Sequence, residues 1–267
     1  MKKFIKKPQT NTKLIIVAGA AGEIGTEFIK KTLDDGHDVI GVIRKKEISL
    51  KHPRLQSIVC NLDDANQIHN SFSKLDFSKY SHITYLHTIG VDKFNARNYP
   101  NISKMSTIDP DVYDTNVNSF KYLLRYLVNR LRIQKRDTSP LKLKIVALTG
   151  SADKYTPFVI EDFCEAKFII REYIRSYISR FPGWIHGLCI NVTSTITESA
   201  LAVRPFAETT YWLTPEEVVN ESYSELITDS VGYNELDVIK YSPDYIEGYY
   251  EDNEALYQKW GKEVGII

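Results

Sequence analysis

The chain has 267 residues, of which 43% are hydrophobic, and this is enough to bury the core of one α/β domain. Its 34 basic and 34 acidic side chains cancel, so no net field favours nucleic acid or an anionic membrane, and small molecules or other subunits are the expected partners. No apolar run approaches the roughly 20 residues of a membrane-spanning helix, and the chain begins without the apolar segment of a secretion signal, so we expect a cytoplasmic protein.

A strand, a tight turn and a helix are predicted near the start of the chain. Residues 1–12 are rich in lysine and are interpreted as a flexible basic tail. Residues 14–17 then form an apolar run, and Gly19, Gly22 and Gly25 follow it ahead of a helical pattern. Glycine suits a backbone that approaches a pyrophosphate, because no β-carbon intervenes, and the helix N-terminus offers free N–H groups to the anion. The stretch predicts nucleotide binding, with an ordinary strand-to-helix turn as the alternative.

The G-x-x-G-x-x-G spacing resembles the opening motif of the short-chain dehydrogenase/reductase (SDR) family, in particular its extended branch. The resemblance covers residues 13–240 and implies a single NADP-binding domain with a Rossmann-type, doubly wound parallel sheet of about seven strands flanked by helices. It also implies that the cofactor lies against this turn. The implied contacts are Gly19, Ala21, Gly22, Glu23, Ile24 and Gly25.

The second strand is predicted at residues 38–44 and ends in Arg44, which two lysines follow. A Rossmann site that selects NAD usually has Asp or Glu here to hold the ribose hydroxyls, whereas a guanidinium attracts a 2′-phosphate. We therefore expect NADP(H) to be favoured over NAD(H), with a solvated basic turn as the alternative. After a third strand at 55–61, the resemblance implies that Asn61 and Leu62 lie against the adenine ring.

A fourth strand is predicted to end in Thr88, Ile89 and Gly90. By resemblance these residues contact the cofactor, and Gly90 again permits a close approach of the backbone. A long amphipathic helix is predicted next, at about 109–131. Within it, Asn116 matches the family's helical asparagine, which helps to place the water of a proton relay; the alternative is a polar residue on the solvated side of the helix.

The catalytic residues of the family match the segment that follows a fifth strand, at 143–149. Ser151 stands where the family has its catalytic serine, and Phe163 and Lys167 have the i, i+4 spacing of its Tyr-x-x-x-Lys pair. The resemblance implies that Ser151 polarises the substrate oxygen and that Lys167 holds the nicotinamide ribose. Phe163 lacks the atom that moves a proton, a function typically worth ~10²- to 10⁴-fold in rate. We hypothesise that Tyr155 supplies the acid; a surface tyrosine is the alternative.

A sixth strand, at 184–192, leads into Thr193 where the family has Pro-Gly. The resemblance assigns Thr193 and Ile196 to the cofactor. Residues 193–211 are expected to form a substrate lid. Within the lid, Arg204 is either a bidentate partner for a carboxylate or phosphate of the substrate or a surface cation.

The last strand is predicted at 236–239, and residues 241–267 form a C-terminal extension rich in tyrosine and acidic residues. Such a segment covers the active site, joins subunits or packs on its own domain. The three cysteines are widely spaced in apolar segments, which fits reduced core thiols better than disulfides or a metal site.

The leading interpretation is an atypical SDR-type, NADP(H)-dependent oxidoreductase that acts on a carbonyl/alcohol pair of a small molecule. The resemblance implies a homodimer or homotetramer. One alternative is a non-redox enzyme on the same fold, such as a dehydratase, lyase or isomerase. The other is a catalytically silent nucleotide-binding or scaffold protein.

Overall fold

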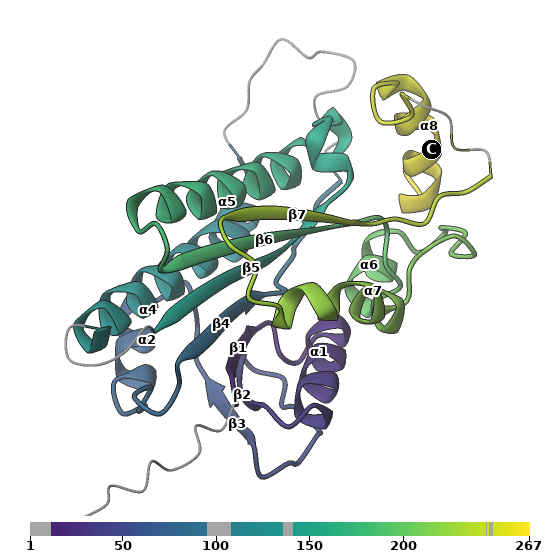
Figure 1. Ribbon diagram of the computed structural model, residues 1–267. Coiled ribbons are helices and arrows are strands. Elements are labelled where there is room, and N and C mark those ends of the chain that lie inside the picture. Colours follow the sequence, from purple (N-terminus) through teal and green to yellow (C-terminus); the bar gives the residue numbers. More distant parts are fainter. Residues whose placement is uncertain (1–11, 95–107, 136–140, 244, 246–247) are drawn as a thin grey trace, which may run out of the picture.

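Seven parallel strands form the centre of the molecule, in the order β3-β2-β1-β4-β5-β6-β7 (Figure 1). The computed structural model describes residues 12–94, 108–135, 141–243, 245 and 248–267, so the predicted basic tail lies almost wholly outside the described residues. The all-parallel Rossmann-type sheet expected from the sequence is confirmed. The strands are β1 (Leu14–Ala18), β2 (Asp38–Ile43), β3 (Leu55–Val59), β4 (His82–His87), β5 (Lys142–Gly150), β6 (Ile185–Val192) and β7 (Tyr233–Val238).

Helices cover both faces of this sheet (Figure 1). The helices are α1 (Glu23–Asp34), α2 (Ala65–Phe72), α3 (Pro110–Tyr113), α4 (Ser119–Lys135), α5 (Glu161–Arg180), α6 (Glu198–Val203), α7 (Pro215–Ile227) and α8 (Asn253–Val264). Short helical turns complete them: η2 (Asp114–Asn118), η3 (Ala152–Lys154) and η4 (Phe158–Ile160). One apolar core lies between the sheet and α2, α4 and α5, and a second lies between the sheet and α1 and α7. Within the described residues, no helix is both long and apolar enough to cross a bilayer.

The unbroken apolar runs of the sequence become strands because both faces of the sheet are buried. In β1, Ile16 belongs to the α2/α4/α5 core, while Ile15 and Val17 belong to the α1/α7 core. Alternate side chains of a strand point to opposite faces, so each apolar residue of the run has a core to enter. β7 is different because it is an edge strand with polar residues; it begins at Tyr233, three residues before the predicted start at Leu236.

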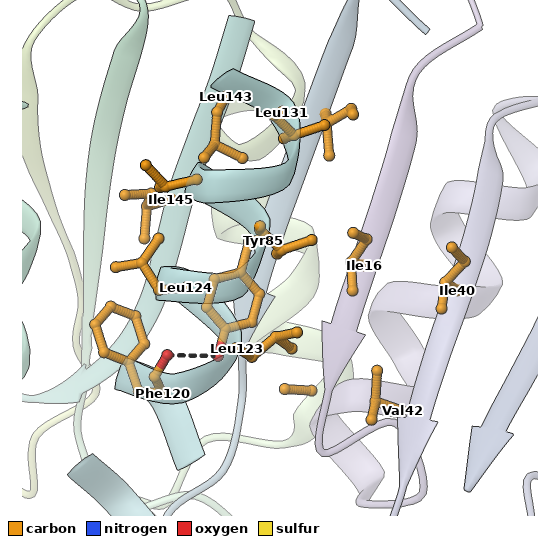
Figure 2. Packing of buried hydrophobic residues seen from close by; sticks show 14 of the residues in the cluster. Ile16, Ile40, Val42, Tyr85, Phe120, Leu123, Leu124, Leu131, Leu143 and Ile145 are labelled. Carbon is orange, nitrogen blue, oxygen red and sulfur yellow. Dashed lines mark hydrogen bonds between the residues drawn. The ribbon is translucent and has the colours of Figure 1, made fainter. Parts of the chain in front are cut away.

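Figure 2 shows the packing of α4 on the sheet. Phe120 and Leu124 point from α4 toward side chains of β4 and β5, among them Tyr85 and Ile145. The Tyr85 hydroxyl donates a hydrogen bond to the Phe120 carbonyl at 3.4 Å, which gives the one polar atom of this ring a partner inside the core.

The long helix predicted at 109–131 is interrupted by a π-helical turn, η2. Asn116 lies in this turn, and its amide nitrogen donates to the carbonyls of Val91 and Val112, both at 2.9 Å. Its amide oxygen accepts from the Val91 N–H at 3.3 Å. π-Helical turns are frequent where a side chain bonds within the helical ladder. Here the asparagine fixes the segment after β4 to the helix.

Candidate active site

A cavity of about 330 Å³ lies at the carboxyl ends of the central strands. Ligands of doubly wound sheets bind at this edge, where the strand order reverses, and the reversal here lies between β1 and β4. The cavity is therefore in the position that the fold assigns to a ligand. Its lining comes from residues 22–25, from 88–92 after β4, from 148–152 at the end of β5, from 192–195 after β6, from Lys167, and from Tyr250 and Trp260 near the C-terminus.

The glycines of the first turn have different roles. Gly19 has φ +85°, and a β-carbon there would lie 2.7 Å from the Thr88 hydroxyl. A β-carbon on Gly25 would lie 2.3 Å from the Gly19 carbonyl oxygen, so both positions are closed by the protein itself. A β-carbon on Gly22 would meet only that oxygen, at 3.4 Å, and Gly22 lines the cavity. Gly22 is thus the glycine of this turn whose open side faces the cavity.

The N-terminus of α1 also faces the cavity. Gly22 is its N-cap and provides no side-chain hydrogen bond, so the N–H groups of the first turn are left for an anion. Glu23 and Ile24 line the cavity here, whereas Ala21 packs partly against the α1/α7 core. The Glu23 carboxylate accepts from the Glu198 N–H at 2.6 Å and so connects α1 with the start of α6.

The residues expected at the adenosine end lie beside this cavity and outside its lining. Arg44 is exposed at the end of β2. Burial and nearby Asp114 raise the pKa of Asp63, and the Arg44 guanidinium opposes this rise. Asn61 and Leu62 precede Asp63, and Leu62 is buried in the α2/α4/α5 core. The structure therefore brings the ends of β2 and β3 together around a cationic group.

Lys167 is a fully buried cation inside the site. Its Nζ donates to the Ile89 carbonyl at 2.9 Å and lies 5.1 Å from the centre of the Phe163 ring. Burial lowers the pKa of the Lys167 ammonium to about 8, although two carboxylates, Asp153 and Asp92, act in the opposite direction. The lysine is therefore mostly charged at neutral pH and held next to the loop after β4.

Phe163 and Lys167 share one face of α5, as their spacing predicted, and both line the cavity. A β-carbon on Gly90 would lie 3.6 Å from Lys167 Nζ and 3.8 Å from the Phe163 ring. A β-carbon on Gly150 would lie 3.5 Å from the same ring. The phenylalanine ring therefore lies in the cavity between Gly90, Gly150 and Lys167, and it has no atom that can donate or accept a proton.

Ser151 is buried directly after β5, and its N–H donates to the Val192 carbonyl at 2.9 Å. Its hydroxyl oxygen lies 3.2 Å from the hydroxyl of Tyr250, which lines the same cavity. Tyr155 lies outside the lining and is 47% exposed; its ring stacks on that of Tyr250 with centroids 5.6 Å apart. The phenol next to Ser151 therefore belongs to Tyr250, which sequence reasoning missed because 99 residues separate the two.

An ion pair anchors the turn that carries Ser151. Asp153 accepts from the Gly150 N–H at 3.1 Å and pairs with Arg171 at 2.8 Å. Burial raises the pKa of Asp153 and the Arg171 guanidinium opposes this. Both side chains are buried, so Asp153 supports the turn rather than facing a substrate.

The segment after β6 contributes hydroxyl groups to the cavity. Thr193 lines it, and its hydroxyl also accepts from the Lys240 N–H at 3.1 Å. Ile196 lies outside the lining, and its N–H donates to the Leu213 carbonyl at 2.7 Å. The structure thus places Thr193 in the lining of the cavity, whereas the Ile196 N–H is bonded to Leu213.

Arg204, directly after α6, connects this segment to the C-terminal extension. Its guanidinium donates to the Ser194 hydroxyl at 2.7 Å and pairs with Glu263 of α8 at 3.3 Å. It also lies 4.2 Å from the ring centre of Trp212 and 5.6 Å from that of Trp260. Because these groups surround it, Arg204 is neither a surface cation nor a fork with both arms free for a substrate.

Asp92 is a second cavity residue that the sequence did not reveal. Its Oδ1 atom is fully buried and has no hydrogen-bond partner among the described residues. Burial raises the pKa of Asp92 to about 6, and the charges of Arg204 and Lys167 oppose this rise. A buried, unpaired carboxylate oxygen is costly, which marks Asp92 as a candidate functional group.

The C-terminal extension contributes to the wall of the cavity through Tyr250 and Trp260. Its α8 lies beyond the sheet on the same side as α6 (Figure 1). A third apolar cluster joins it to η4 and α5. The fully buried or nearly buried members are Phe158, Val159, Ile160, Cys164, Tyr250, Leu256 and Trp260. Of the roles left open by the sequence, this segment packs on its own domain and closes the site.

No protein-family model and no curated protein sequence matches this chain, but many solved structures share its fold. The 3-ketoacyl-(acyl-carrier-protein) reductase of Brucella melitensis, complexed with NADH, has a TM-score of 0.69 at 14% identity, over 86% of this chain and 98% of that one. A short-chain dehydrogenase of Burkholderia cenocepacia, in complex with NADP, has a TM-score of 0.66 at 15% sequence identity, and the match covers 93% of this chain and 97% of that one. An SDR-family oxidoreductase of Burkholderia thailandensis has a TM-score of 0.69 at 14% sequence identity, and the match covers 95% of this chain and 99% of that one. The chain therefore has the fold of SDR structures.

Proposed function

We propose that the protein is an SDR-type oxidoreductase that uses NADP(H) to interconvert a carbonyl and an alcohol on a small molecule. The observation that carries this proposal is that the glycine turn, Ser151 and Lys167 line one and the same cavity. Structures of the same fold are complexed with NADH or with NADP, which supports a nicotinamide dinucleotide. Such a cofactor supplies or removes a hydride when it is bound.

The described residues fit a dinucleotide. Gly22 and Gly90 leave open the space that a β-carbon would fill, and the first turn of α1 has no side-chain cap to compete with a phosphate. The Lys167 ammonium has three N–H donors, and one of them is bonded to the Ile89 carbonyl. The other two can donate to ribose hydroxyls. Ser151 donates its hydroxyl to the substrate oxygen and so stabilises the charge that develops there.

The preference for NADP(H) rests on Arg44. The side chain is exposed at the end of β2, where the adenine ribose lies in a Rossmann site, and no acidic residue takes its place there. Its guanidinium suits a 2′-phosphate. We further propose a homodimer or homotetramer in the cytoplasm, for which light scattering of the purified protein gives the subunit number.

The test is a fluorescence titration with NADPH and NADH. Arg44→Asp should weaken NADPH binding about tenfold to a hundredfold, since a hydrogen bond between charged groups is worth about 1.5–3 kcal/mol, and should leave NADH binding nearly unchanged. Lys74→Asp is the matched control, because it makes the same change of charge at an exposed residue just after α2. If the wild-type chain binds neither nucleotide, the proposed function is wrong.

Phe163 favours a catalytically silent nucleotide-binding protein as the second candidate, because the ring beside Lys167 cannot move a proton. The two candidates differ in turnover. We would incubate the protein and NADPH with benzaldehyde, cyclohexanone and 2,3-butanedione and follow the loss of nicotinamide absorbance. Turnover supports the oxidoreductase, whereas tight NADPH binding without turnover, also after Phe163→Tyr, supports the silent protein. A non-redox enzyme would instead convert its substrate without consuming NADPH.

A further inference from the structure

We propose that Tyr250 is the proton donor of this reaction, so that a residue of the C-terminal extension performs the step that Phe163 cannot. The inference rests on the proposed function. It starts from a contact that the chain makes over a long distance, since the Tyr250 hydroxyl lies 3.2 Å from the hydroxyl oxygen of Ser151.

Both hydroxyl groups belong to the lining of one cavity, and both residues are buried. A substrate oxygen placed against them can accept a hydrogen bond from each. That arrangement satisfies the geometric requirement for a general acid, which is hydrogen-bond reach to the atom that takes the proton. Ser151 then holds the oxygen, and Tyr250 delivers the proton.

The other acidic groups of the cavity are less suited to this step. Lys167 is bound to the Ile89 carbonyl and its charge serves cofactor binding. Asp92, with its pKa raised to about 6, is mostly ionised at neutral pH and has no proton to give. Burial raises the pKa of Tyr250 to about 12, and the hydrogen bond between Tyr250 and Ser151 opposes this rise. The phenol therefore keeps its proton until an alkoxide, a stronger base, forms beside it.

Aromatic neighbours fix the position of this phenol. The Tyr250 ring stacks on Tyr155 at 5.6 Å and meets Tyr249 edge-on at 5.2 Å. Trp260 of α8 lies 6.5 Å away on the side of the cavity. Aromatic contacts of this kind hold a ring at little cost in side-chain freedom, so the hydroxyl is placed before the substrate arrives.

The chemical step balances as follows. A bound NADPH would supply the hydride: its C–H bond to that hydrogen would break as the new C–H bond forms at the carbonyl carbon, and the π electrons of the C=O bond would move to oxygen. The Tyr250 O–H bond breaks as the O–H bond of the alcohol forms. Tyr250 is left as a phenolate, which regains its proton from water. The sum is carbonyl, NADPH and one proton giving alcohol and NADP⁺.

The test is Tyr250→Phe, which keeps the ring in the aromatic cluster and removes only the hydroxyl. For NADPH-dependent reduction of 2,3-butanedione, or of whichever carbonyl of the panel reacts fastest, kcat should fall by roughly 10²- to 10⁴-fold, the usual contribution of a general acid. The Kd for NADPH should not change, because Tyr250 touches the substrate side. Tyr249→Phe is the matched control: it removes a phenol of the same cluster from outside the cavity lining, and should keep wild-type turnover.

Three results would overturn the assignment. Wild-type turnover in Tyr250→Phe shows that the phenol gives no proton. If Asp92→Asn loses turnover while Tyr250→Phe keeps it, the proton donor is Asp92. Faster turnover in Tyr250→Ala shows that the side chain blocks the cavity. A wild-type chain that binds no nucleotide and reduces no carbonyl refutes the proposed function as well, whereas the first three results leave it standing.

Discussion

In the proposed function the cavity has a nucleotide side, next to the turn at Gly22 and Gly25, and a substrate side, next to Ser151 and Tyr250, and the two are built differently. On the nucleotide side much of the wall is backbone, at Gly22 and Gly25 of the first turn and at Gly90 after β4. On the substrate side the walls are side chains that distant segments bring together, such as Ser151 and Tyr250. A backbone wall depends on residues that are close in the sequence, whereas a side-chain wall depends on tertiary packing. The first kind can therefore be recognised in one sequence and the second kind cannot.

The largest expected effect is on the substrate side. Trp260→Ala removes a nearly buried ring from the third cluster and should lower the stability of the extension by about 3–5 kcal/mol. Hydrogen exchange should then rise in residues 248–264 and stay unchanged in α1. Lys262→Ala, exposed on the same helix, should change stability by no more than about 0.5 kcal/mol. Equal loss of protection in α1 and α8 would show that the two sides unfold as one unit.

The buried carboxyl group of Asp92 should make the substrate side sensitive to pH. Its folded-state pKa of about 6 lies above the ordinary 3.8, so the folded chain binds this proton more tightly, and stability is lost as the pH rises through about 6. Each pKa unit between the folded and the unfolded chain corresponds to about 1.36 kcal/mol. The ionised Asp92 side chain should therefore lower the free energy of unfolding at pH 7 by about 3 kcal/mol.

Asp92→Asn removes the charge and should therefore stabilise the protein by up to that amount at pH 7. Urea unfolding at pH 4 and at pH 7 measures the difference, which should nearly vanish at pH 4. If the difference in free energy of unfolding between Asp92→Asn and wild type is the same at pH 4 and at pH 7, Asp92 does not carry a buried, unpaired charge.

The smallest expected effect separates two glycines of the nucleotide side. Gly25→Ala places a β-carbon 2.3 Å from the Gly19 carbonyl and should destabilise the protein by about 1–3 kcal/mol. Gly22→Ala has room, with a single contact at 3.4 Å, so it should lower NADPH affinity with little change in melting temperature. If Gly22→Ala binds NADPH as tightly as wild type does, the nucleotide does not lie against Gly22.

Sequence reasoning located the strands that carry buried apolar runs, because a parallel sheet between two helical layers demands them. It was less accurate at β7, where an edge strand with polar residues lacks that signal. It also missed the π-helical turn at Asn116, since the bonds that accompany it reach Val91, 25 residues away.

Within the site, Ser151 and Lys167 were expected in the cavity and lie there, because their positions follow from one strand and one helix of ordinary spacing. Tyr155 was the tyrosine nearest to Ser151 in the sequence, yet Tyr250 is the one in contact with it. Nothing in a tyrosine-rich segment tells which ring turns inward. The tyrosines near the C-terminus were the only signal, and packing against α5 and η4 makes the choice.

The contact between Ser151 and Tyr250 has a consequence for how the protein is made. A ribosome completes all seven strands, and with them the glycine turn, before it adds residues 248–264. N-terminal parts of a chain generally fold first during synthesis. The glycine turn can therefore be in place on a nascent chain before Tyr250 and Trp260 complete the lining of the cavity, and the last helix docks only after that segment leaves the exit tunnel. The complete cavity thus forms late, at the moment when α8 docks.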